Sequence, residues 1–80
     1  MFQVLLHNDD YTTREFVIMI LCQVFRKPEP EAARIMMAVH THGIGVAGVY
    51  PHEVAETKVH VVTELAKAHG YPLKCTVEAE

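Results

Sequence analysis

Three consecutive polar residues, Asn8, Asp9 and Asp10, bring several hydrogen-bond acceptors together at one point of the chain. An ammonium group carries only donors, so a turn that presents such a cluster could bind an amine. The same triplet could be a turn that only links a strand to a helix, because Asn and Asp favour that position. The triplet by itself leaves both interpretations open.

A second group of residues could complete a binding site. Met36, Val39 and His40 are spaced three and four residues apart, so on a helix they share one face. Core packing explains Met36 and Val39 equally well, but a histidine on an apolar face needs a polar partner. Acceptors on a turn, together with an apolar face that carries one histidine, would suit a cationic amine with an apolar tail.

Other chemistry finds little support in the sequence. Six histidines invite a metal site, but neither a His-Glu-x-x-His motif nor a zinc-type cysteine pair occurs, and we expect no metal and no cofactor. We interpret Cys22 and Cys75 as reduced packing thiols, since they lie far apart in the sequence. No phosphate-binding Gly-Lys-Ser/Thr motif follows the glycines. We expect no catalysis and keep a small thiol or metal enzyme as an alternative.

The composition is typical of one small globular domain. Of the 80 residues, 50% are hydrophobic and 21% are charged, and the net charge is −3. The chain has no basic stripe, which argues against nucleic acid as a partner. No apolar run reaches membrane-spanning length, and residues 8–10 interrupt the only N-terminal signal-peptide candidate. We therefore expect a cytoplasmic protein without a membrane partner.

The elements that position the polar turn can be predicted from spacing. A strand is expected from Phe2 to His7, directly before the turn. Thr12 and Glu15 are typical of a capping box, and the apolar residues that follow predict a helix running to about Phe25. Met36, Val39 and His40 belong to a second helix, whose ends are indicated by a proline in its first turn and a glycine after its last. These two are Pro30 and Gly43.

The second half of the chain continues with a strand from Ile44 to Tyr50, a helix between Pro51 and Gly70, and a strand from Leu73 to Val77. The element order is thus β-α-α-β-α-β. It predicts an α+β two-layer domain in which a three-stranded antiparallel sheet packs against three helices. The buried stripe expected on the third helix consists of Val54, Val61, Leu65 and Ala68.

At these residues the chain resembles ClpS, the bacterial adaptor family of the N-end rule pathway. Members of this family deliver substrates to the AAA+ unfoldase ClpA for degradation by the protease ClpAP. The resemblance covers nearly the whole chain, and its most specific parts are the Asn-Asp-Asp-Tyr-Thr and Glu-Val-Ala-Glu-Thr-Lys-Val runs. It is carried by residues 8–12, 15–17, 36, 38–40, 48–49, 53–59, 72–73 and 75–76.

The resemblance implies a role for each matching residue. Asn8, Asp10 and His40 would hold the free α-amine and the first peptide unit of a substrate, with Asp9 and Thr12 on the same rim. An apolar pocket would accept an N-terminal Phe, Tyr, Trp or Leu, with one wall residue acting as a gate against β-branched side chains. The pocket residues are Val17, Met36 (the gate), Val39 and Leu73. Glu53 and Lys58 would face the N-terminal domain of ClpA.

Two features depart from the family pattern. Arg14 stands where the family usually has Met, so it could lie along the pocket rim or pair with Glu15 or Glu31 away from it. The family also uses a flexible N-terminal tail in handing over substrates, and we expect residues 1–80 to be the single core domain without that tail. A plain protein-protein interaction module of similar fold, like the C-terminal domain of the ribosomal stalk protein, is the alternative. Such a module would need no amine-binding acceptors.

Overall fold

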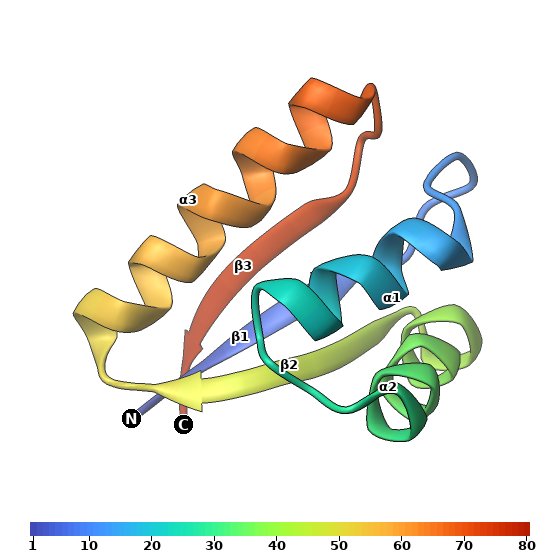
Figure 1. Cartoon of the computed structure of the whole chain (residues 1–80). Helices are drawn as coiled ribbons and strands as arrows, with labels where there is room; N and C mark the ends of the chain where they lie inside the picture. Colours follow the sequence, from blue (N-terminus) through green and yellow to red (C-terminus); the bar gives the residue numbers. More distant parts are fainter.

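Three strands and three helices follow one another in the expected order β-α-α-β-α-β. The computed structural model describes all residues from 1 to 80 and is shown in Figure 1. None of its helices is long and apolar enough to cross a membrane. The elements are β1 (Phe2–His7), α1 (Arg14–Gln23), α2 (Glu29–His42), β2 (Ile44–Tyr50), α3 (His52–His69) and β3 (Lys74–Ala79).

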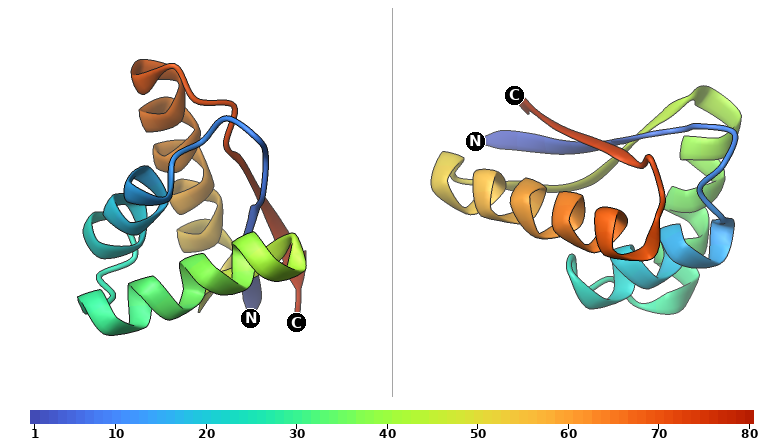
Figure 2. Two further views of the ribbon diagram at one scale, coloured as in Figure 1. Left: turned by 90° about the vertical axis from the view of Figure 1, so that its right-hand side faces the viewer. Right: turned by 90° about the horizontal axis from the view of Figure 1, so that it is seen from above.

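The strands form one antiparallel sheet in the order β2-β1-β3. In the middle of β1, Leu5 is paired with Val46 of β2 and with Thr76 of β3, and the β2 register shifts between Val4 and Leu5. All three helices lie on the same side of this sheet (Figure 2, right), so the domain has two layers. The predicted α+β two-layer fold is therefore confirmed.

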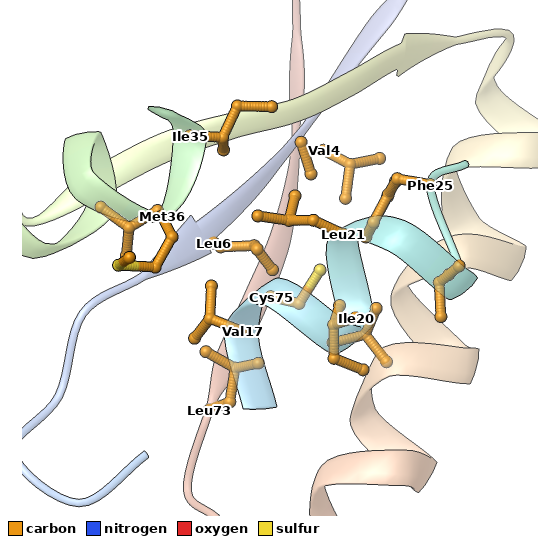
Figure 3. Close-up of a cluster of buried hydrophobic side chains, with 14 of the residues drawn as sticks. Val4, Leu6, Val17, Ile20, Leu21, Phe25, Ile35, Met36, Leu73 and Cys75 are labelled. Atoms are coloured by element: carbon orange, nitrogen blue, oxygen red, sulfur yellow. The ribbon is translucent and has the colours of Figure 1, made fainter. Parts of the chain in front are cut away.

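The core lies between the two layers and is organised around β1. Val4 and Leu6 have no exposed surface and point toward the helices, because alternate residues of a strand face the same side of the sheet. Burying a side chain of this size stabilises the fold by about 1.5–3 kcal/mol. Figure 3 shows Met36 and Val17 at one end of the buried cluster and Phe25 at the other.

The start of α1 differs from the predicted capping box. Thr13, not Thr12, caps the helix, since its side-chain oxygen accepts a hydrogen bond from the backbone N–H of Phe16 at 3.1 Å. The hydroxyl of Thr12 is engaged elsewhere, as described below. The helix also ends at Gln23, two residues before the predicted Phe25. Both differences concern helix ends, where sequence patterns are least precise.

The buried face of α3 was predicted wrongly. Val54 and Val61 are 42% and 37% exposed, whereas the fully buried positions are Ala55, Val62 and Ala66. The small side chains of the two alanines allow the helix axis to approach the sheet closely, so the buried stripe is rotated by one residue. Of the predicted stripe, only Leu65 packs partly against the core, and Ala68 is exposed. The third strand likewise begins one residue later than predicted, at Lys74.

Candidate functional site

The turn after β1 is held together by the carboxylate of Asp9. One carboxylate oxygen accepts hydrogen bonds from the backbone N–H groups of Tyr11 and Thr12, at 2.8 and 2.7 Å. The other accepts one from the Thr12 hydroxyl at 2.7 Å. Burial alone would raise the pKa of Asp9, but these hydrogen bonds outweigh it and hold the pKa below its usual value. Asp9 is therefore an ionised residue whose acceptors are used inside the turn.

Asn8 and Asp10 behave differently from the aspartate between them. Both side chains are exposed, and neither makes a hydrogen bond within the chain. The backbone of the turn is ordered by Asp9, so these two flanking side chains are displayed on a fixed support without being needed to build it. They leave an amide oxygen and a carboxylate free for a ligand.

Two glycines bring the turn after β1 next to α2. The backbone N–H of Asn8 donates to the carbonyl of Gly43 at 2.9 Å, which ties the end of β1 to the end of α2. Gly43 ends that helix in the left-handed conformation, at φ 85°. At Gly45, an added Cβ would lie 2.6 Å from the Cγ2 of Val39, so only glycine allows α2 to pack this tightly on β2. His40 is thereby placed beside a turn about thirty residues away in the sequence.

A cavity of about 450 Å³ opens where the turn, α1 and α2 meet. Its apolar wall is formed by Val17, Met36 and Val39, which are 6%, 8% and 2% exposed. The volume lies in the range of small-ligand sites, and an apolar wall below a few polar groups is their usual construction. The lining residues are Asn8, Asp9, Asp10, Tyr11, Thr12, Thr13, Arg14, Glu15, Val17, Met36, Val39 and His40.

Most residues proposed for this site from the sequence do line the cavity. The exception is Leu73, which is 6% exposed and belongs to the buried core but does not line the cavity. In Figure 3 it lies at the same end of the core as Val17. Tyr11, Thr13 and Glu15 line the cavity without having been singled out, although their places between predicted site residues could have indicated them.

Arg14 takes the position at the cavity, not the one away from it. Its Nη2 lies 2.8 Å from the Nε2 of His40, and this hydrogen bond connects the first residue of α1 with α2. Arg14 forms no ion pair with Glu15 or Glu31, and Glu31 is paired with a lysine and another arginine instead. The contact between Arg14 and His40 could not be predicted from the sequence, because no local pattern links residues so far apart.

Glu53 and Lys58 lie at a different place, on the α3 side of the molecule. They line a second cavity, of about 520 Å³. The Nζ of Lys58 donates to the carbonyl of Val24 at 2.7 Å and lies 5.7 Å from the centre of the Tyr50 ring. Lys58 therefore pins the end of α1 to α3, whereas Glu53 is exposed and makes no ion pair. The other lining residues are Gln23, Val24, Arg26, Val54, Thr57 and Val61.

The cysteines lie in the packed part of the molecule. Both are free thiols; Cys75 is buried and Cys22 is half-buried. Burial raises the pKa of Cys75 to about 12, so its thiol is protonated at neutral pH and is a poor nucleophile. No group of three or more His, Cys, Asp and Glu side chains is arranged so that it could hold a metal ion.

Known proteins of one family are similar to this chain over nearly its whole length. Residues 1–76 match the family model described as ATP-dependent Clp protease adaptor protein ClpS. An ATP-dependent Clp protease adapter protein ClpS from Desulfatibacillum aliphaticivorans is 62% identical over 80 residues, which are 100% of this chain and 77% of that protein. The protein of the same name from Nitratidesulfovibrio vulgaris (strain DSM 19637 / Miyazaki F) is 63% identical over 78 residues, 98% of this chain and 78% of the relative.

A solved structure is similar in three dimensions as well. Agrobacterium tumefaciens ClpS2 bound to L-phenylalaninamide superimposes with a TM-score of 0.95 at 46% sequence identity. The match covers 99% of this chain and 95% of that one. The similarity therefore extends over both layers of the fold and over the segments that form the cavity.

Proposed function

The chain belongs to the ClpS family of ATP-dependent Clp protease adaptors, and on this premise we propose that it captures proteins by an exposed N-terminal Phe, Tyr, Trp or Leu. The captured protein would then be delivered to the unfoldase ClpA for degradation by ClpAP. The cavity at the start of α1 is the binding site for the N-terminal residue in this proposal. The first side chain enters it, and the α-amine stays at its mouth.

The observation that carries this proposal is the pair of unused acceptors beside an apolar wall. Asn8 and Asp10 present free oxygens at the mouth of a cavity whose wall is Val17, Met36 and Val39. A protein N-terminus with a large apolar first residue carries a cationic donor group and a hydrophobic side chain on the same Cα atom. Few other groups on a protein surface offer both.

The ligand of the solved relative has this chemistry. L-phenylalaninamide, which is bound to Agrobacterium tumefaciens ClpS2, carries a free α-amine, a phenyl side chain and an amide in place of the first peptide bond. In our chain, burying the phenyl ring would contribute about 1.5–3 kcal/mol. Charge-assisted hydrogen bonds from the ammonium group to Asn8 and Asp10 would add specificity for a free N-terminus.

Binding of paired peptides tests the proposal. A fluorescent peptide beginning with Phe is compared with its N-acetylated twin by fluorescence anisotropy at one salt concentration. Acetylation removes the charge and leaves the acceptors unpaired, so affinity should fall by about 2–4 kcal/mol. Equal affinities would overturn the proposal and support a plain interaction module instead.

A matched pair of variants makes the test specific to the site. Asp10→Asn removes one carboxylate charge at the cavity, and Glu78→Gln removes one on β3, outside both cavities. The two substitutions change the net charge equally. The Phe peptide should lose affinity with Asp10→Asn and keep it with Glu78→Gln, whereas an equal loss would indicate a general effect of charge.

For the contact with the unfoldase, we propose that Glu53 and Lys58 have different roles. Glu53 is exposed and unpaired, so it is free to contact the N-terminal domain of ClpA. Lys58 is half-buried and bonded to the carbonyl of Val24, so its main contribution is to hold the surface of the second cavity in place. Glu53→Gln should weaken binding to the isolated ClpA domain in calorimetry without changing the melting temperature. Binding that is unaffected by Glu53→Gln would place the contact elsewhere.

We further propose that the chain itself catalyses no reaction and works in the cytoplasm, where its thiols stay reduced. The support is chemical: Cys75 has a raised pKa and is shielded from substrates, and free thiols suit a reducing compartment. Peptides beginning with Phe should be recovered intact by mass spectrometry after long incubation with the protein alone. Cleaved or modified peptide would contradict the proposal.

A further inference from the structure

Arg14 supplies a positive charge at the mouth of the cavity that the chain does not neutralise. It is the first residue of α1, its side chain is exposed, and it lines the cavity. It forms no ion pair, although Asp10 and Glu15 line the same cavity. Its one hydrogen-bond partner is the Nε2 of His40.

The bond to His40 also determines which groups face a ligand. A guanidinium can only donate, so the Nε2 of His40 must accept at 2.8 Å and cannot carry a proton. The group that the ring can then offer to a ligand is the N–H on Nδ1. Arg14 and His40 together therefore offer a ligand only donors, on a bridge that joins α1 and α2.

The acceptors and donors of the mouth are thus divided between two places. Asn8 and Asp10 offer oxygens for an ammonium group, and the bridge of Arg14 and His40 offers N–H groups. In the proposed complex the first side chain fills the apolar end of the cavity, and the remaining ligand must leave through the mouth. Its second residue then passes within reach of the long Arg14 side chain.

We infer that Arg14 is a specificity-determining residue, which binds the carboxylate of an acidic second residue in the ligand. This inference rests on the proposed function. Substrates with a bulky first residue followed by Asp or Glu are then the preferred class for this chain. Without Arg14, the carboxylates of Asp10 and Glu15 would repel such a second residue, and the guanidinium offsets this repulsion as the one Arg or Lys group that lines the cavity.

Three peptides that differ only at the second position test the inference. They begin Phe-Glu, Phe-Gln and Phe-Lys, have free N-termini, and are measured by fluorescence anisotropy at low salt. The Glu peptide should bind roughly 1.5- to 5-fold more tightly than the Gln peptide, the scale of one exposed ion pair. The Lys peptide should bind more weakly than the Gln peptide, and the differences should shrink at high salt.

Two variants assign the effect to the correct arginine. Arg14→Met removes the charge at the mouth, and Arg34→Met removes one from an exposed side chain of α2 that does not line the cavity. The preference for Glu over Gln should disappear or reverse with Arg14→Met and persist with Arg34→Met. Equal ratios in the wild type and in Arg14→Met would overturn the inference.

Failure of the inference can be told apart from failure of the proposed function. If the Phe-Gln peptide binds no better than its acetylated form, the proposed function is wrong, and the second position carries no information. If Phe-Gln binding requires the free amine but Glu and Gln bind equally, only the role of Arg14 is refuted. A thermal melt of Arg14→Met, which changes an exposed side chain, checks that the variant is folded.

Discussion

The two neighbouring aspartates in the turn after β1 should respond differently to substitution by Ala, one in stability and the other in ligand binding. Asp9 accepts three hydrogen bonds from Tyr11 and Thr12, at 2.7–2.8 Å, whereas Asp10 accepts none. Asp9→Ala should therefore destabilise the fold and Asp10→Ala should mainly weaken ligand binding. Because the two residues are adjacent, of one type and equally charged, each variant is the control for the other.

The magnitude for Asp9→Ala can be worked from its contacts. Each hydrogen bond contributes about 0.5–1.5 kcal/mol net, and partial exposure of the carboxylate places the value near the lower limit. Three such bonds together stabilise the turn by about 2 kcal/mol, which in a domain of this size lowers the melting temperature by roughly 8–16 °C. Asp10→Ala should change the unfolding free energy by less than about 0.5 kcal/mol, and should lower the affinity for a Phe peptide by about 2 kcal/mol.

Acid provides a second check on Asp9. Its pKa in the folded protein lies below the ordinary value of 3.8, so as the pH falls the unfolded chain takes up the proton first. The difference in unfolding free energy between the wild type and Asp9→Ala should therefore have its full size above pH 3.8. It should shrink as the pH falls through the pKa of Asp9 in the folded protein. For both variants, thermal melts monitored by circular dichroism measure stability, and fluorescence anisotropy measures the affinity for a Phe peptide. A stable Asp9→Ala beside an unfolded Asp10→Ala would refute the assignment of roles in this turn.

Four further predictions have defined outcomes. Met36→Ala should lower the unfolding free energy by about 2–5 kcal/mol and reduce the discrimination between first residues Leu and Ile by about 1–3 kcal/mol; unchanged rejection of Ile in competition anisotropy would show that another residue is the gate. With Cys22 replaced by Ser, iodoacetamide at pH 8 should modify Cys75 only after unfolding, as seen by mass spectrometry, because its pKa of about 12 keeps the folded thiol protonated. The same raised pKa predicts that the unfolding free energy falls as the pH rises above about 9, because the thiol of the unfolded chain ionises first. An equal pH dependence of the unfolding free energy in the wild type and in Cys75→Ser would contradict this. Lys58→Met should lower the unfolding free energy by about 1–2 kcal/mol in denaturant melts, because it loses the hydrogen bond to the carbonyl of Val24, the residue that caps α1. The exposed control Lys67→Met should have no effect, and equal losses would show that the bond is unimportant.

Much of this domain follows from local sequence alone. Apolar runs, prolines and glycines determine where the strands and helices lie, because these residues act on the backbone within a few positions of themselves. The order of elements then leaves a two-layer α+β arrangement as the way to bury the apolar faces. The specific runs at residues 8–12 and 53–59 identified the family, and with it a binding site that composition could not have indicated.

Local patterns were misleading where two interactions competed for the same residue type. Two adjacent threonines could each cap α1, and the carboxylate of Asp9 decides between them by binding Thr12 and leaving Thr13 free. On α3, valines at helical spacing favoured a stripe that the fold rotates by one residue, because close packing on the sheet selects alanines. Neither choice can be read from one element, since each depends on a neighbour.

The character of the site was decided only by the tertiary structure. The sequence placed Asn8, Asp9 and Asp10 together but could not say that one aspartate builds the turn and the two flanking residues remain free. The sequence also could not decide whether Arg14 lies at the pocket rim or pairs with a glutamate away from it. The hydrogen bond to His40 forms only because α1 and α2 are packed against each other. Which acceptors are free and which charge lies at the mouth depends on distances between elements, and those distances arise when the core closes.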